Sequence, residues 1–116
     1  MGYDLNFWIY KKGIYLNNQE VYKKGSNGEI IEGLEELPIE QIHQEIADEF
    51  REWEMEDSDR SWENPNGKGA LIMESTSQFV RFDCYGMTGD DMNRIIDVML
   101  KFGCPLYDPP TRYDQS

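Results

Sequence analysis

The segment 78–108 constrains the fold most, because it reads as a strand, a tight turn, an amphipathic helix and a short final strand. Every second residue over 80–84 is apolar, and a period of two places these residues together on one face of a strand. Thr88 and Asp91 then have the spacing of a helix-capping box. We therefore expect a core strand over 79–85 that leads directly into a helix.

Apolar residues recur at helical spacing over 92–100, which predicts that one side of this helix is buried. Gly103 is a natural helix end, because glycine tolerates the left-handed conformation that often follows the last turn. Pro105 prevents the helix from continuing, so residues 106–107 can pair as a short last strand.

Residues 3–10 form the expected first strand. The side chains of Tyr3, Leu5, Phe7 and Ile9 share one face, which we expect to be core. The opposite face is unusual, because it carries the two large aromatic residues Trp8 and Tyr10 beside polar ones.

A second helix is predicted from Pro38, since proline is well tolerated in the first helical turn. Apolar residues follow at steps of three and four, which is typical of a buried stripe. The members of this stripe are Ile39, Ile42, Ile46, Phe50 and Trp53. His43 lies at the edge of the stripe, where a packing role is the expected one.

The order strand, helix, strand, strand, helix, strand predicts one α+β domain over 1–116, with a strand over 70–74 before the central segment. This order is that of a ferredoxin-like, split β-α-β fold, in which an antiparallel sheet carries both helices on one face. Residues 11–37 would be an insertion after the first strand, and residues 54–69 an acidic loop.

The second face of the predicted sheet carries aromatic side chains and an arginine, a composition typical of protein-binding hot spots. Two alternatives remain open: this face is exposed, or the insertion folds over it. The residues concerned are Trp8, Tyr10, Phe79, Arg81 and Tyr85.

The net charge of −12 is concentrated in one part of the chain. Residues 31–64 contain thirteen acidic and two basic residues and carry −11, whereas residues 1–30 carry +1. Such a charge disfavours binding to nucleic acid or to an anionic membrane and favours a basic partner. The alternative is that the acidic residues only keep the protein soluble.

Enzyme activity is not expected, because the chain has one histidine and none of the familiar nucleophile, phosphate-loop or zinc motifs. Asp57, Asp59 and Ser61 resemble the start of a calcium loop. The match fails where Trp62 and Lys68 replace the required glycine and glutamate, so we predict no metal and no cofactor.

Cys84 and Cys104 match no metal-ligand spacing, and we interpret them as reduced structural thiols. A disulfide between them would require a short distance between their α-carbons. The chain also contains no run of 18 apolar residues and no apolar leader after a basic N-terminus. These observations predict a cytoplasmic protein without a membrane segment.

Several short stretches resemble small bacterial proteins that accompany secreted or contact-dependent toxin genes. The stretches are YDLNFW at 3–8, GLEELP at 33–38, FVRFDCYGM at 79–87, DMNRIIDVML at 91–100 and FGCPLYDP at 102–109. Together they cover a third to a half of the chain. The resemblance implies an immunity protein, which neutralises a toxin domain by binding it, and it assigns no role to any single residue.

We therefore predict an acidic protein-binding module whose partner is a cognate toxin with a basic active-site cleft. A DNA-mimicking inhibitor of a nucleic-acid-binding protein and a general regulatory module are the alternatives. The expected contact residues are acidic side chains of the second helix and of the loop after it, with Trp62 or Trp8 as an anchor. The acidic members are Glu45, Asp48, Glu49, Glu52, Glu54, Glu56, Asp57 and Asp59.

Overall fold

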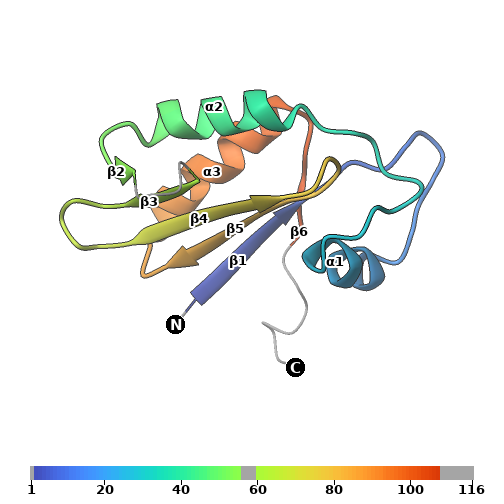
Figure 1. The fold of residues 1–116 in the computed structure, drawn as a ribbon, viewed down its shortest axis with the longest axis horizontal. Helices are drawn as coiled ribbons and strands as arrows, with labels where there is room; N and C mark the ends of the chain where they lie inside the picture. Colours follow the sequence, from blue (N-terminus) through green and yellow to red (C-terminus); the bar gives the residue numbers. More distant parts are fainter. Residues whose placement is uncertain (1, 56–59, 108–116) are drawn as a thin grey trace.

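The computed structural model describes residues 2–55 and 60–107, and within them the chain forms one six-stranded antiparallel sheet with three helices (Figure 1). The strands lie in the order β2-β3-β4-β5-β1-β6. Their bounds are Gly2–Phe7 for β1, Glu54–Met55 for β2, Ser61–Glu63 for β3, Ala70–Ser75 for β4, Val80–Tyr85 for β5 and Leu106–Tyr107 for β6.

The fold is α+β, as predicted, but the sheet has six strands, and its full order is not that of the classic four-stranded ferredoxin-like sheet. Two strands, β2 and β3, extend it beyond β4, within the stretch that the sequence predicts to be an irregular acidic loop. The loop prediction is wrong there because Trp62, at the centre of β3, is buried against the core and pairs with Leu71.

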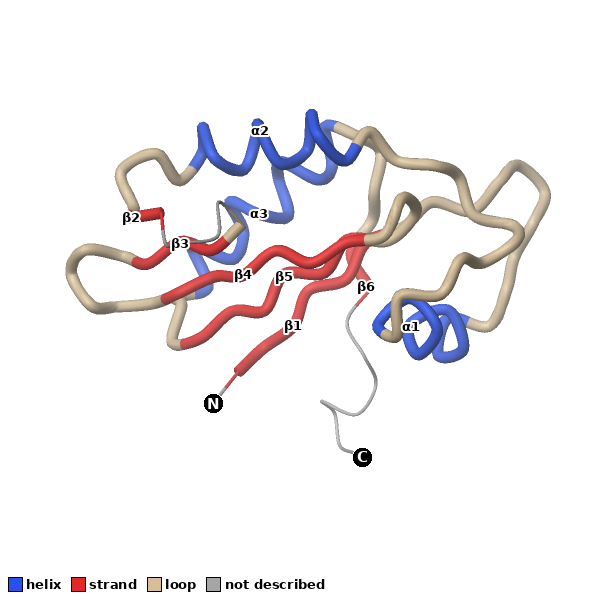
Figure 2. Tube along the Cα trace, in the orientation of Figure 1, coloured by secondary structure: helices blue, strands red, loops and turns tan. Residues whose placement is uncertain are grey.

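Helices α2 (Ile39–Glu49) and α3 (Gly89–Lys101) pack side by side on one face of the sheet (Figures 1 and 2). The predicted stripe of α2 is confirmed, because Ile42, Ile46 and Phe50 are fully buried in the main core. The capping prediction is also confirmed, since the Thr88 hydroxyl accepts a hydrogen bond of 3.1 Å from the backbone N–H of Asp91.

The third helix, α1 (Asn18–Ser26), belongs to the predicted insertion and lies on the opposite side of the sheet from α2 and α3 (Figure 1). The side chain of Asn17 caps its start, and the helix continues through Gly25, which is packed against the ring of Phe79. A β-carbon at this glycine would lie only 2.4 Å from that ring. Glycine therefore allows α1 to rest directly on the sheet.

A second, smaller core joins the insertion to this face of the sheet. Both expectations about the face hold in part: the insertion covers the half that bears Trp8 and Phe79, and it leaves Tyr85 exposed at the other half. The buried members of the second core are Trp8, Val21, Ile31, Leu34 and Phe79.

Both thiols lie inside the fold. Cys84 and Cys104 are free cysteines with 1% and 0% of their surface exposed. Burial raises the pKa of the Cys104 thiol to about 11, so this group stays protonated at neutral pH. Within the described ranges, no helix combines the length and apolar character needed to cross a membrane.

Candidate protein-binding surface

The acidic residues that the sequence predicts to meet a partner are largely engaged within the protein. Arg94, on α3, reaches across to the end of α2, where its guanidinium binds Glu49 at 2.8 Å and Glu52 at 2.9 Å. It also binds Asp91 on its own helix at 3.2 Å and the backbone carbonyl of Glu49. The same group lies 4.4 Å from the centre of the Phe50 ring, a distance suited to a cation–π contact.

These contacts change the titration of the groups involved. Partial burial acts to lower the pKa of Arg94, but the hydrogen bonds to Glu49, Glu52 and Asp91 outweigh it and raise the pKa. Slight burial acts to raise the pKa of Glu52, but its own backbone and Arg94 leave this pKa below its usual value of 4.5. The cluster thus ties α2 to α3 rather than presenting free negative charge.

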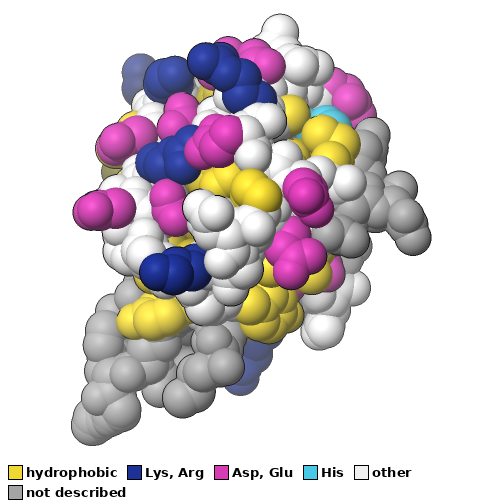
Figure 3. Space-filling view, turned by 90° about the vertical axis from the view of Figure 1, so that its left-hand side faces the viewer, with side chains coloured by type: hydrophobic (Ala, Val, Ile, Leu, Met, Phe, Trp, Pro, Cys, Tyr) yellow, Lys and Arg dark blue, Asp and Glu magenta, His cyan; other side chains and the backbone are white. Residues whose placement is uncertain are grey.

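Other acidic residues of the predicted site have different surroundings. Glu45 lies 3.7 Å from Lys101, whereas Asp48 and Glu54 are exposed. Figure 3 shows Lys and Arg side chains interleaved with Asp and Glu over the upper part of one end of the molecule, on the side of the helices. The predicted contacts through Glu56, Asp57 and Asp59 lie outside the described residues.

The two expected aromatic anchors are not on the surface. Trp62 is 1% exposed because β3 turns its indole into the core beneath α2, next to His43. Trp8 is 4% exposed because it is stacked on Phe79, with ring centres 5.8 Å apart, and enclosed by the insertion. Neither indole can anchor a partner without a rearrangement of the fold.

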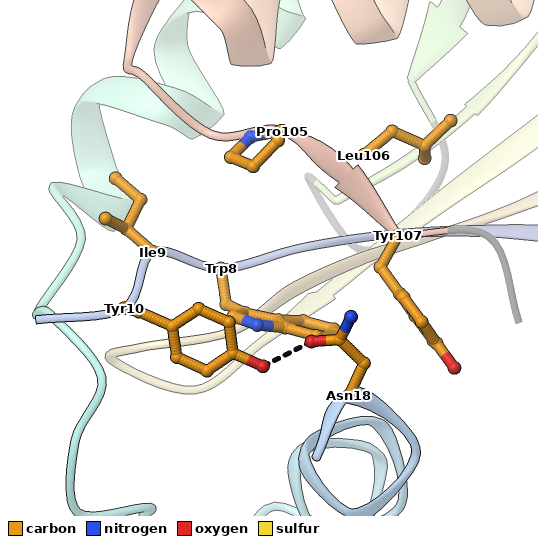
Figure 4. Close-up of a pocket in the computed structure, with 7 residues that line it drawn as sticks. All are labelled: Trp8, Ile9, Tyr10, Asn18, Pro105, Leu106 and Tyr107. Carbon is orange, nitrogen blue, oxygen red and sulfur yellow. Dashed lines mark hydrogen bonds between the residues drawn. The ribbon is translucent and has the colours of Figure 1, made fainter. Parts of the chain in front are cut away.

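A small cavity of about 200 Å³ lies beside Trp8, between the end of β1, β6 and the start of α1 (Figure 4). Tyr10 and Tyr107 flank the indole, and the Tyr10 hydroxyl donates a hydrogen bond to the side-chain oxygen of Asn18. The cavity is lined by Trp8, Ile9, Tyr10, Asn18, Pro105, Leu106 and Tyr107, and this lining is uncharged. It offers an apolar slot, but nothing that would select a basic partner.

The uncovered half of the second sheet face is different, because its strand register places acidic side chains directly opposite one another. Asp4 on β1 faces Asp83 on β5, and Glu54 on β2 faces Glu63 on β3. Glu74 on β4 is exposed on the same face, since it is opposite Arg81 in the register. We call this set, with Tyr85 on β5, the acidic sheet face: Asp4, Glu54, Glu63, Glu74, Asp83 and Tyr85. Within it Asp83 is buried, with 9% of its surface exposed.

The pair nearest the insertion is held in a hydrogen-bond network. Arg81 binds Asp83 at 2.8 Å, and Asp4 accepts hydrogen bonds from the Tyr22 hydroxyl at 3.0 Å and from the Asn6 amide at 3.1 Å. Partial burial acts to lower the pKa of Arg81, but Asp83 and then Asp4 outweigh it and raise the pKa. Arg81 therefore offsets the negative charge of both Asp83 and Asp4. The amide oxygen of the fully buried Asn6 has no hydrogen-bond partner among the described residues.

The negative charge of the second pair, Glu54 and Glu63, is not offset in this way. Glu54 and Glu63 are both exposed, and no basic side chain in residues 2–55 and 60–107 forms a salt bridge with either of them. Between the two pairs lie the part-exposed Ala70 and Ile72 of β4, and Tyr85 of β5, which is 46% exposed, lies opposite Ala70. The acidic sheet face thus combines an apolar centre with carboxylates on two sides, which suits arginine or lysine side chains of a protein partner.

Sequence reasoning missed this surface for a definable reason. The prediction of a strand over 79–85 correctly assigned Arg81 and Tyr85 to the second face of the sheet. The opposition of Glu54 and Glu63 depends on the pairing of β2 with β3, which no alternation in the loop predicts.

Comparison with known proteins adds no assignment. No family model matches the chain, and no curated protein matches it. In the part of the chain that the structure describes, no group of three or more His, Cys, Asp or Glu side chains is placed to hold a metal ion.

Proposed function

We propose that this chain is an acidic protein-binding module that neutralises a basic partner by covering it with the acidic sheet face. One observation carries the proposal: the directly opposed, exposed Glu54 and Glu63 lie in one cross-strand row with Ala70 and the exposed Tyr85, and no basic side chain of the described residues forms a salt bridge with either glutamate. Like charges directly opposite each other destabilise a sheet, so the Glu54–Glu63 pair lowers the stability of the free chain. Basic side chains of a partner would relieve that repulsion. Acidic residues that only kept the protein soluble would not need to lie directly opposite each other.

The acidic sheet face is favoured over the α2 surface because of the ion pairs already made there. Glu49 and Glu52 would have to leave Arg94 before they could bind a partner, and Glu45 would have to leave Lys101.

Glu54 and Glu63 are exposed and form no salt bridge within the described residues, so they can pair with a partner without losing an existing ion pair. Asp83, by contrast, is buried against Arg81 and is not a contact residue. Aromatic side chains at the centre of a charged rim are also the usual composition of a binding hot spot.

The partner that we propose is a toxin with a basic active-site cleft, which makes this chain an immunity protein. The charge of −12 suits such a cleft, because complementary charge accelerates encounter. The resemblance of the strand and helix motifs to proteins that accompany toxin genes supports the same assignment. No enzymatic role is proposed.

The test compares two variants with the same change in net charge. Glu54→Lys/Glu63→Lys/Glu74→Lys alters the acidic sheet face, and the matched control changes exposed acids elsewhere, namely Glu36→Lys/Asp48→Lys/Asp97→Lys. Tagged wild type and both variants are used to capture partners from the native cells at low and high salt. Bound proteins are identified by mass spectrometry and then expressed alone and with this chain.

We expect wild type and the control variant to retain one stoichiometric basic protein at low salt, and the sheet-face variant to lose it. That protein should arrest growth when expressed alone and should be harmless with this chain. Retention by both variants would place the interface elsewhere. A captured nucleic-acid-binding protein that is not toxic would support the DNA-mimic alternative, and the absence of any basic partner would refute the proposal.

A further inference from the structure

A second exposed surface lies at the insertion end of the molecule, away from the acidic sheet face. Four large apolar side chains are exposed there: Ile14 by 38%, Tyr15 by 86%, Leu16 by 39% and Ile30 by 70%. We call these four residues the insertion patch. The acidic sheet face accounts for the basic partner but leaves this patch unexplained.

The insertion patch is held in place rather than loosely exposed. Ile14 and Leu16 pack over Gly33, where an added β-carbon would come within 3.0 Å and 3.3 Å of their side chains. The Tyr10 hydroxyl, which donates to Asn18, also lies 3.1 Å from the Leu16 carbonyl oxygen, and the ring of Tyr10 lies 6.0 Å from that of Tyr15. A pre-ordered patch loses less conformational entropy when it is covered.

The patch has both a projection and a hollow. Tyr15 is the most exposed large apolar residue among those described. Next to it, a hollow of about 210 Å³ has an apolar floor of Leu16, Val21 and Ile31, with Glu20 and Lys24 at its rim. A projection beside a hollow is the arrangement that a two-fold axis makes self-complementary, because each copy can fill the hollow of the other.

The charge distribution favours a second copy at this end. Two molecules of charge −12 repel each other, but the insertion, residues 11–37, carries four lysines against five acidic residues and so only −1, whereas the rest of the chain carries −11. Four lysines of this segment are exposed, namely Lys11, Lys12, Lys23 and Lys24. Across a two-fold axis, Lys24 of one copy can meet Glu20 of the other, so the rim is complementary to itself.

We propose that the insertion patch is the interface of an isologous homodimer, in which Tyr15 of each copy enters the hollow between Leu16 and Ile31 of its partner. The two acidic sheet faces then remain free. The dimer does not depend on the proposed function, since it concerns the purified chain without any partner.

The test is sedimentation equilibrium of the full chain over its soluble concentration range, with variants that remove exposed apolar side chains. Tyr15→Ser and Ile30→Ser alter the patch, and Leu100→Ser, on the 56% exposed side chain of α3, is the matched control. Circular dichroism verifies that each variant is folded.

We expect wild type and Leu100→Ser to show the mass of a dimer that dissociates on dilution. Tyr15→Ser should raise the dissociation constant by about 30-fold or more, as expected for a central hot-spot tyrosine, and Ile30→Ser should raise it to a smaller extent. A monomer at every concentration would overturn the proposal. Equal dissociation constants for wild type and both patch variants would show that any dimer uses another surface.

Discussion

At the scale of single residues, Arg94 forms three ion pairs, more than any other described residue. One guanidinium binds three carboxylates and a backbone carbonyl, and it covers the Phe50 ring. The carboxylates that it neutralises are Glu49 of α2, Glu52 in the turn after α2 and Asp91 of α3, which would otherwise repel one another.

We expect Arg94→Met to lower the free energy of unfolding by about 2 kcal/mol, the usual effect of losing hydrogen bonds to charged groups. Methionine keeps the contact with Phe50, so the loss reports the polar interactions. Urea denaturation followed by circular dichroism measures it. Arg51→Met, at an exposed arginine close to the end of α2, should change stability by less than about 0.5 kcal/mol.

The effect of Arg94 should also depend on pH. The pKa of Glu52 is lowered in the folded state, so its interaction contributes fully above the usual value of 4.5 and is lost as pH falls through the lower folded value. The stability difference between wild type and Arg94→Met should therefore shrink in acid. A difference that stays constant between neutral pH and pH 3 would contradict a role through carboxylate pairing.

At the scale of elements, the decisive contact is that of α1 with the sheet. Gly25 lies against Phe79 so closely that any side chain there must push the helix outward. This contact divides the second sheet face into a covered half and the acidic sheet face, and so determines which surface a partner can reach.

Gly25→Ala should therefore lower the free energy of unfolding by roughly 1–3 kcal/mol, the usual effect of overpacking. Gly89→Ala is the matched control, because that glycine is also helical and has open space where a β-carbon would lie. The control should be neutral or slightly stabilising, since alanine favours helix. Equal urea midpoints for Gly25→Ala and wild type would show that α1 does not depend on this contact.

The elements also show how far sequence reasoning reaches. Segments with a clear period, such as the stripe of α2 and the alternation of β5, form the predicted helix and strand with the predicted buried faces. The stretch 54–69 has no period, because two or three paired residues are too few to show alternation, so β2 and β3 were not predictable. The burial of Trp8 depends on the tertiary position of the insertion, which local pattern does not encode.

At the scale of the whole molecule, uneven charge is the dominant property. The chain carries −12, and the ion pairs that offset part of this charge join α2 to α3 and Asp83 to Arg81. The remaining repulsion acts over the whole surface and weakens the compact state. It also makes the surface of the insertion, residues 11–37, a region of weak repulsion between two copies.

Moderate salt should therefore stabilise the fold, even though it weakens the individual ion pairs. Raising sodium chloride from about 0.01 M to about 0.1 M shortens the screening length from about 30 Å to about 10 Å. We expect a higher urea midpoint for wild type and a larger increase for Arg94→Met, which has lost its most favourable pairs. A midpoint that falls with salt would mean that attraction between neighbouring charges outweighs repulsion across the molecule.

The two outermost strands, β2 and β6, contain two residues each. A long edge strand with unpaired backbone groups can pair with neighbouring chains and start fibre formation. Edge strands of two residues offer few such groups. The ends of this sheet therefore give a neighbouring copy few backbone groups with which to pair, which disfavours aggregation through β2 or β6. Under the proposed function, the same property would let the chain be kept folded before its toxin is made.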